Sequence, residues 1–250
     1  MQIHTVKARL VNSYIIEEHG MLAVVDVAAG GAEEVAGYIN EVLQRDLEEV
    51  ELIVCTHDDI DHIGGIYKLA RACDAAVGIP WASKNARRKL SNDPFGAIFR
   101  PMTMMLEILR PRMWSMYASP SRNRKARGNP RASLGAAANQ QRRPKQPDYY
   151  LKHRQTLPGF GRWETIHTPG HSWDSCGYYH SDSRTLLTGD AFLGSGTKER
   201  LVLPAIKSNP WQYWMTFRHL KELPIEHIYP GHGSSMHGHD LLDHWLEKLK

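Results

Sequence analysis

Four side chains of the kinds that bind metal ions lie close together in the sequence THDDIDHIGG: His57, Asp59, Asp61 and His62. Imidazole nitrogen and carboxylate oxygen are ligands for hard and borderline divalent cations, and residues two apart at the end of a strand can point the same way. Gly64 and Gly65 follow the cluster and allow the chain to turn into a helix. We therefore expect half of a metal site here.

Three later segments each present one ligand-type residue beside a glycine at the end of an expected strand. They are TPGHS with His171, TGDAF with Asp190 and YPGHG with His232. A lone histidine near Gly and Pro is more often a turn residue than a ligand. Three such segments in this order, together with the first cluster, predict a complete metal centre.

The elements that must position these residues alternate between strands and helices. The opening alternates apolar residues, turns at His19-Gly20 and continues as the apolar run MLAVVDV, which predicts a hairpin leading into a buried strand. A helical pattern over residues 32–46 precedes the short strand ELIVCTH, and a helix at 66–75 precedes the strand AAVGIP. This is a βαβ rhythm with the first cluster at a strand end, where α/β folds usually carry chemistry.

A second regular stretch begins near Tyr150. It contains the strands that lead to His171, Asp190 and His232, an apolar-striped helix at 209–224 and a closing helix at 241–250. Residues 83–149 have another character: a part rich in Met and aromatic residues precedes a Gly/Pro/Arg/Gln-rich part typical of a loop. We interpret residues 1–250 as one domain and residues 83–149 as an insertion that covers the active site.

The amino-acid composition is that of an ordinary globular protein. The chain has 250 residues, 42% of them hydrophobic and 23% charged, and no apolar run near the roughly 20 residues of a membrane span. The first residues lack the pattern of a signal peptide, and three scattered cysteines make a disulfide framework implausible, so we expect a cytoplasmic protein. Ten of the 31 basic residues, and no acidic one, lie between Arg110 and Lys145.

The ordered motifs resemble the signature of the metallo-β-lactamase fold, in which His-x-His-x-Asp-His is followed by a distant His, Asp and His. The resemblance spans about residues 8–235 outside the insertion and includes Asn12-Ser13-Tyr14 on the opening strand. Asp26 resembles the acidic residue with which the family braces the metal-loop backbone. The resemblance implies an α/β fold, a four-layer αββα sandwich of two mixed sheets with helices outside.

One position departs from the family pattern, because Asp59 stands where the second histidine is usual. By resemblance, one metal ion would be held by His57, Asp59 and His171, the other by Asp61, His62 and His232, with Asp190 bridging. We expect two divalent metal ions, with zinc as the first choice. The extra carboxylate makes the first site harder, which favours Mn²⁺ or Fe²⁺ more than three imidazoles would. The alternative is that Asp59 only caps the turn and that a single metal ion occupies the other site.

The predicted function is metal-dependent hydrolysis of an ester, thioester, lactone or related acyl bond. A water between two cations loses a proton near neutral pH, and Asp61 is the expected catalytic residue that orients it and carries a proton. A phosphodiesterase or nuclease, and a non-hydrolytic mononuclear iron enzyme, are the enzymatic alternatives. A ligand-binding module is disfavoured, since all seven ligand positions hold metal-capable side chains.

The insertion bears on the substrate and on partners. Its Met and aromatic residues could line an apolar substrate pocket, for which we name Phe99, Met102, Met105 and Trp114; packing or a homodimer contact is the alternative. The partner we expect is a small molecule. A nucleic-acid substrate is disfavoured because the basic run lacks aromatics after Tyr117 and the remaining chain is acidic, while a peripheral membrane contact stays open.

Overall fold

The computed structural model describes residues 1–8, 11–109, 146–195 and 200–243. The chain divides into two compact units. Of the described residues, unit 1 contains those in the ranges 1–79 and 146–150, and unit 2 contains those in the ranges 80–109 and 151–243.

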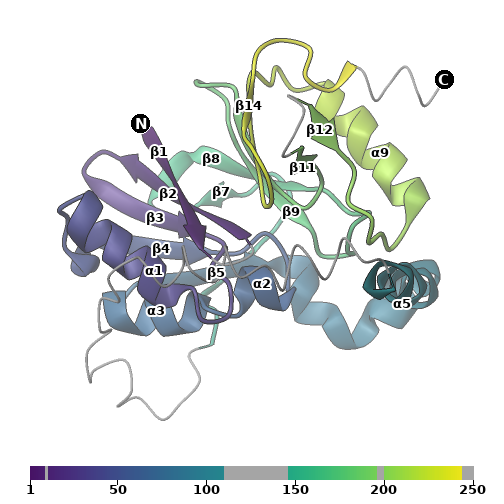
Figure 1. The fold of residues 1–250 in the computed structure, drawn as a ribbon, viewed down its shortest axis with the longest axis horizontal. Helices are drawn as coiled ribbons and strands as arrows, with labels where there is room; N and C mark the ends of the chain where they lie inside the picture. Colours follow the sequence, from purple (N-terminus) through teal and green to yellow (C-terminus); the bar gives the residue numbers. More distant parts are fainter. Residues whose placement is uncertain (9–10, 110–145, 196–199, 244–250) are drawn as a thin grey trace. The chain divides into compact units, whose positions relative to one another are not determined.

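Unit 1 is built on a six-stranded sheet in the order β1-β2-β3-β4-β5-β6 (Figure 1). The strands are β1 (Gln2–Ala8), β2 (Val11–Glu18), β3 (Met21–Val25), β4 (Val50–Val54), β5 (Ala76–Pro80) and β6 (Tyr149–Leu151). The first three pair antiparallel, and β3, β4 and β5 pair parallel. The predicted hairpin is confirmed, since β2 and β3 are joined at His19 and Gly20, which both have positive φ.

Helices connect the parallel strands of unit 1, which confirms the βαβ pattern. They are α1 (Ala32–Gly37), α2 (Ile60–Ile63) and α3 (Ile66–Cys73). The single helix expected over residues 32–46 is wrong in its length: α1 passes into a π-helical turn (Tyr38–Val42). A 3₁₀ turn (Leu47–Glu49) then leads into β4. Val35, Ile39 and Leu69 are fully buried in the core between these helices and the sheet, so the apolar stripes pack as the pattern predicts.

Unit 2 is built on a second six-stranded sheet, in the order β14-β13-β10-β9-β8-β7. Its strands are β7 (Thr156–Leu157), β8 (Phe160–His167), β9 (Cys176–His180), β10 (Thr185–Gly189), β13 (His227–Pro230) and β14 (Met236–His237). The strands β11 (Leu193–Gly194) and β12 (Leu201–Val202) form a separate pair. Only β10 and β13 are parallel among the pairs defined in this sheet.

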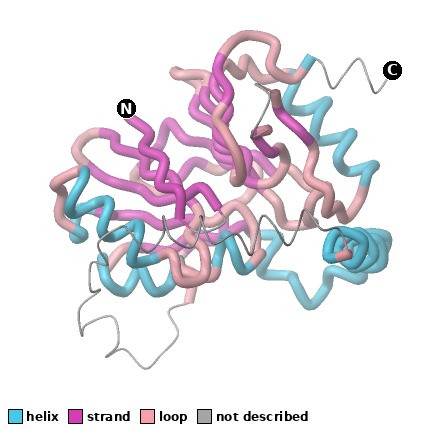
Figure 2. Tube along the Cα trace, viewed as in Figure 1, coloured by secondary structure: helices cyan, strands magenta, loops and turns pink. Residues whose placement is uncertain are grey.

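Unit 2 also contains helices, drawn in cyan in Figure 2. Helix α9 (Pro210–Lys221) begins at Asn209, whose side chain accepts hydrogen bonds from the next two free backbone N–H groups. Its residues Tyr213 and Phe217 are buried in the core with residues of the sheet. A 3₁₀ helix (Trp81–Arg88), α4 (Lys89–Asn92) and α5 (Pro94–Ile108) form the first part of the predicted insertion.

Several expectations fall outside the described residues. The basic run and Trp114 lie within residues 110–145, and most of the closing helix lies within residues 244–250. No helix in the described part of the chain is long and apolar enough to cross a membrane.

Candidate metal centre

The loop after β4 carries the first ligand group of unit 1. His57 and His62 are fully buried, whereas the side chains of Asp59 and Asp61 are 28% and 22% exposed. Asp59 Oδ2 lies 3.3 Å from His57 Nε2, and Asp61 Oδ2 lies 3.9 Å from His62 Nε2. The unit therefore offers two histidine–carboxylate pairs, one on the loop after β4 and one in α2.

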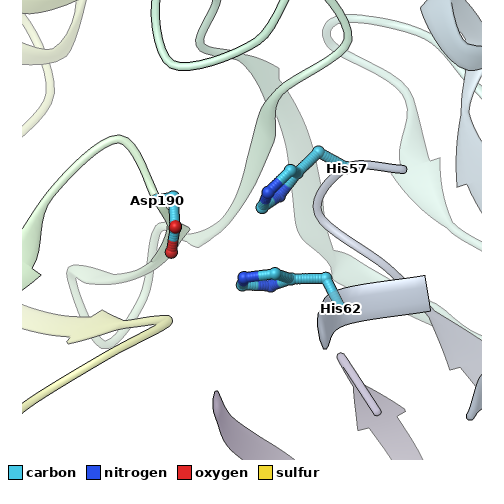
Figure 3. A group of neighbouring side chains, drawn as sticks. All are labelled: His57, His62 and Asp190. Atoms are coloured by element: carbon cyan, nitrogen blue, oxygen red, sulfur yellow. The ribbon is translucent and has the colours of Figure 1, made fainter. Parts of the chain in front are cut away.

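The rings of His57 and His62 lie close to each other. Their centroids are 4.1 Å apart with planes tilted by 42°, and Figure 3 shows both rings extending in the same direction from their backbones. Both imidazoles are therefore buried side by side next to the start of α2.

Asp26 braces this loop, as the family resemblance implies. Its carboxylate accepts a hydrogen bond from the backbone N–H of Thr56 (2.7 Å), another from the Thr56 hydroxyl (2.9 Å) and a third from His62 Nδ1 (2.8 Å). Because Nδ1 of His62 donates to a carboxylate, its Nε2 carries the lone pair that a metal ion requires. Asp26 therefore orients one histidine and ties it to the backbone of the loop.

Thr56 extends the same network to His57. Its hydroxyl hydrogen points to Asp26, so its oxygen accepts from Nδ1 of His57 at 3.0 Å. This fixes His57 in the same tautomer as His62, with Nε2 as the metal-binding atom. Sequence reasoning missed Thr56, although its position directly before the histidine was a usable signal.

The glycine pair after the loop permits close packing. A Cβ on Gly64 would lie 2.3 Å from the carbonyl oxygen of Ile60, and one on Gly65 would lie 2.4 Å from that of Ala28. Gly65 donates its N–H to the Val27 carbonyl (2.8 Å). These contacts hold the segment after Asp26 against the metal loop.

His171 opens the second ligand group, in unit 2, between β8 and β9. It is 3% exposed, and its Nδ1 donates to the backbone carbonyl of Ile206 at 2.9 Å. The Ser208 hydroxyl donates to the carbonyl of His171 itself (2.8 Å). The loop before α9 thus selects the tautomer of His171 and holds its backbone, and no local sequence signal marked Ile206 or Ser208 for this role.

Asp190 follows β10, where the pairing with β13 shifts register between Leu187 and Gly189. Its Oδ2 lies 3.8 Å from His171 Nε2 and 3.4 Å from His232 Nε2. The Tyr213 hydroxyl donates to its backbone carbonyl at 3.1 Å. Burial, and then the charge of Asp190, raise the pKa of Tyr213 well above its ordinary value, so this phenol stays protonated and remains a donor.

His232 follows β13 and is held through its backbone. Its carbonyl accepts the N–H of Gly194 at 2.7 Å. The next residue, Gly233, has φ of 87°, and a Cβ there would lie 1.9 Å from the carbonyl oxygen of Gly194. A glycine is required at this position both for the backbone conformation and for the close approach.

The two ligand groups fit divalent metal ions by their donor chemistry. Each of the seven predicted residues offers an imidazole nitrogen or a carboxylate oxygen as a ligand atom. Three of the four histidines are oriented through Nδ1, as in metal sites where an outer hydrogen bond sets the tautomer. Three carboxylates would offset most of the charge of two divalent ions.

Other histidines near the ligands in sequence have structural partners. His167 Nε2 bonds the Trp173 carbonyl at 2.8 Å, and burial lowers its pKa. His237 lies 3.0 Å from His227, and His239 lies 3.3 Å from Glu226. None of them belongs to a potential ligand group among the residues that the structure describes.

Of the predicted substrate-binding residues, Phe99 is half-buried on α5, Met102 and Met105 are exposed, and Trp114 lies outside the described residues. Their role in substrate binding stays a prediction.

The fold and the ligand groups define a class of α/β protein with metal-binding histidines and carboxylates at strand ends. Residues 6–232 match the family model described as the metallo-beta-lactamase superfamily. The chain belongs to this superfamily, whose members are mostly hydrolytic enzymes.

Individual relatives are distant. The chain is 21% identical over 228 residues to the Beta-lactamase-like protein 2 homolog of Drosophila melanogaster, a match that covers 89% of this chain and 58% of the relative. It therefore spans less than two thirds of the length of that relative.

Solved structures share the fold at low identity. A metallo-beta-lactamase family protein from Thermus thermophilus superposes with a TM-score of 0.60 at 19% identity, covering 99% of this chain and 78% of the other. A protein solved in a di-iron-bound form gives a TM-score of 0.57 at 19% identity, covering 95% and 94%. These likenesses confirm the predicted metallo-β-lactamase fold.

Proposed function

We propose that this chain is a metal-dependent hydrolase that cleaves an ester, thioester, lactone or related acyl bond. The two ligand groups serve one centre for two divalent ions. His57, Asp59 and His171 bind the first ion, Asp61, His62 and His232 bind the second, and Asp190 bridges them. The family match supports this assignment because it spans both ligand groups.

The observation that carries the proposal is the orientation of the histidines. His57 and His62 share one buried network through Thr56 and Asp26, and His171 donates to the Ile206 carbonyl. A single buried histidine that donates a hydrogen bond from Nδ1 is ordinary core packing. Here three histidines each donate from Nδ1, and the Nε2 of each lies 3.3 to 3.9 Å from a carboxylate oxygen, which is the pattern of a metal site.

Bound divalent ions would lower the pKa of a water molecule and polarise the scissile carbonyl. The side chain of Asp61 is partly exposed and lies beside a buried histidine, so it can contact solvent and substrate. In our proposal its carboxylate orients the attacking water and carries the proton to the leaving group. Asp26 and Thr56 hold His62 and His57 in the orientation that leaves Nε2 of each ring as the metal-binding atom.

Asp59 bears on which metal is bound. A carboxylate in place of an imidazole makes the first site harder and more anionic, which favours Mn²⁺ or Fe²⁺ relative to a site with three imidazoles. The fold neighbour solved in a di-iron-bound form is compatible with iron. Zinc remains the first expectation, and Fe²⁺ and Mn²⁺ are the alternatives. We place the protein in the cytoplasm, where its three buried cysteines stay as free thiols.

The test combines elemental analysis of the purified protein with a panel of esters, thioesters, lactones and phosphodiesters. Asp190→Ala is expected to lose bound metal and to reduce turnover to background. Asp182→Ala is the matched control, since Asp182 belongs to the same unit but forms an exposed ion pair with Arg162. Full turnover in metal-free Asp190→Ala protein would refute the proposal.

A second variant tests the role of Asp59. Asp59→His restores the residue usual in the family and is expected to shift the bound metal towards zinc when the protein is loaded from an equimolar mixture of Zn²⁺, Mn²⁺ and Fe²⁺ under anaerobic conditions. An unchanged metal ratio would show that Asp59 does not ligate the metal ion.

A further inference from the structure

Residues 206–209, directly before α9, hold His171 both at its ring and at its backbone. The Ile206 carbonyl accepts from His171 Nδ1 at 2.9 Å, and the Ser208 hydroxyl donates to the His171 carbonyl at 2.8 Å. The last two backbone N–H groups of this segment donate to the carbonyl of Gly170 at 2.8 and 3.1 Å. The orientation of the His171 ring therefore depends on where residues 206–209 lie.

Helix α5 and its N-cap residue Asp93 bond the same segment. Thr103 Oγ1 accepts the N–H of Lys207 at 3.2 Å and lies 3.0 Å from the carbonyls of both Lys207 and Arg100, to which its hydrogen can point. The Asp93 carboxylate accepts from Asn209 Nδ2 at 3.0 Å. All of these residues belong to unit 2, and Lys207 stands in the chain between the two residues that bond His171.

The amide of Asn209 joins the beginnings of two helices. Its Oδ1 accepts the N–H groups of Trp211 and Gln212 at 3.1 and 3.3 Å and so caps α9. Asp93 Oδ1 accepts both from Asn209 and from the N–H of Gly96 at 3.0 Å, which caps α5. Asp93 is only 4% exposed, and a buried acceptor that loses its donor is costly, so this junction is strongly held.

Polar bonds, more than apolar burial, connect α5 to residues 206–209. Large apolar side chains of the helix are exposed: Ile98 by 75%, Met104 by 51% and Met105 by 61%. Hydrogen bonds require a narrow range of distances and angles, whereas apolar contacts tolerate sliding. Bonds at Thr103 and Asp93 therefore suit a helix that sets the position of its partner segment.

We propose that Asp93 and Thr103 are positioning residues for the metal ligand His171. They hold residues 206–209 so that the Ile206 carbonyl keeps the proton of the imidazole on Nδ1 and leaves Nε2 as the ligand atom. The inference rests on the proposed function, in which His171 binds the first metal ion. It gives the first part of the insertion a task in building the metal centre.

The first measurement needs no metal. Long-range ¹H–¹⁵N correlation spectra of the full chain with ¹⁵N-labelled histidine report which nitrogen of each imidazole carries the proton. The signals of His171 are assigned by their loss in His171→Gln. We expect the Nδ1–H tautomer in the wild type and a mixture of both tautomers in Thr103→Val and in Asp93→Ala.

The second measurement is the affinity for Zn²⁺ by competition with a chromophoric chelator. Thr103→Val keeps the shape of the side chain but removes the hydroxyl, and we expect about tenfold weaker binding. Asp93→Ala should act in the same direction, whereas Asp93→Asn should bind as the wild type does, because an amide oxygen still accepts from Asn209. Tyr179→Phe is the matched control: it removes a hydroxyl that bonds the Pro224 carbonyl at 3.0 Å in the same unit.

Urea denaturation of the variants separates positioning from stability. Thr103→Val and Tyr179→Phe should lose similar stability, but only Thr103→Val should lose affinity. A single His171 tautomer and wild-type affinity in both Thr103→Val and Asp93→Ala would overturn the inference, as would an equal loss of affinity in Tyr179→Phe. If the wild type binds no metal ion, the proposed function fails, and the tautomer spectra still decide whether Asp93 and Thr103 position His171.

Discussion

The two ligand groups contain similar side chains but are held by different means. In unit 1 the ligands follow one another on one short segment that runs from the loop after β4 into α2, and side chains hold them: Asp26 and Thr56 bond the histidines directly. In unit 2 the ligands come from separate strand ends, and each is held by a bond that involves a backbone group: His171 donates to the carbonyl of Ile206, and the carbonyls of Asp190 and His232 accept from the Tyr213 hydroxyl and the Gly194 N–H. The first group therefore depends on the chemistry of its supports and the second on the path of the chain.

Because the path of the chain holds the ligands of unit 2, we expect the largest effect from a substitution at Gly233. Gly233→Ala adds a Cβ 1.9 Å from the Gly194 carbonyl oxygen at a positive φ, so we expect a loss of about 3 kcal/mol or more in the free energy of unfolding. Gly159 has a similar φ with nothing within 4 Å of a Cβ, so Gly159→Ala should cost only about 1 kcal/mol. Urea denaturation measures both, and equal losses would mean that the close approach at Gly233 is unimportant.

In unit 1 the corresponding effect is on metal affinity. Asp26→Asn keeps the shape of the side chain but weakens the acceptor of the His62 Nδ1 hydrogen bond, so affinity should fall about 10- to 100-fold. Asp74→Asn is the control, because Asp74 also has a positive φ and is exposed away from the ligands. Competition with a chromophoric chelator measures the affinity. An unchanged affinity in Asp26→Asn would show that the carboxylate does not orient the ligand.

The smallest expected effect concerns acid stability in unit 2. Burial lowers the pKa of His167 below its ordinary 6.5, against the raising effect of its bond to the Trp173 carbonyl. The unfolded chain therefore binds this proton more readily than the folded chain, and stability is lost as the pH falls below about 6.5. His167→Gln should reduce that loss in urea denaturation series between neutral and mildly acidic pH. The same pH dependence in both proteins would contradict the assignment.

The first ligand group could be predicted from the sequence because its members are local. The spacing of His57, Asp59, Asp61 and His62 is itself the signal, and the strand before them reads as a buried run. The strands that end at His171, Asp190 and His232 were also visible as apolar segments that stop at glycine. For these elements, local pattern and tertiary structure agree.

The supports of unit 2 could not be predicted in the same way. Ile206 contributes only a backbone carbonyl, which any residue has, and its bond to His171 spans 35 positions in the sequence. The orientation of α5 could not be predicted either: its apolar residues were expected to line a substrate pocket, or to pack or form a homodimer contact, whereas Asp93 and Thr103 bond Asn209 and Lys207 and several of the apolar residues are exposed. In both cases hydrogen bonds between residues far apart in the sequence determine the orientation, of the His171 ring in the first and of α5 in the second.

Asp26 illustrates how few residues a single position can accept. Its φ of 60° lies in the left-handed region, which excludes β-branched and most large side chains and favours Gly, Asn and Asp. Its three hydrogen bonds all come from donors, so glycine supplies no acceptor and asparagine brings an amide with donors of its own. Among the twenty amino acids, aspartate alone meets both requirements, so a saturation library selected for metal-dependent turnover should return almost only the parental codon at this position.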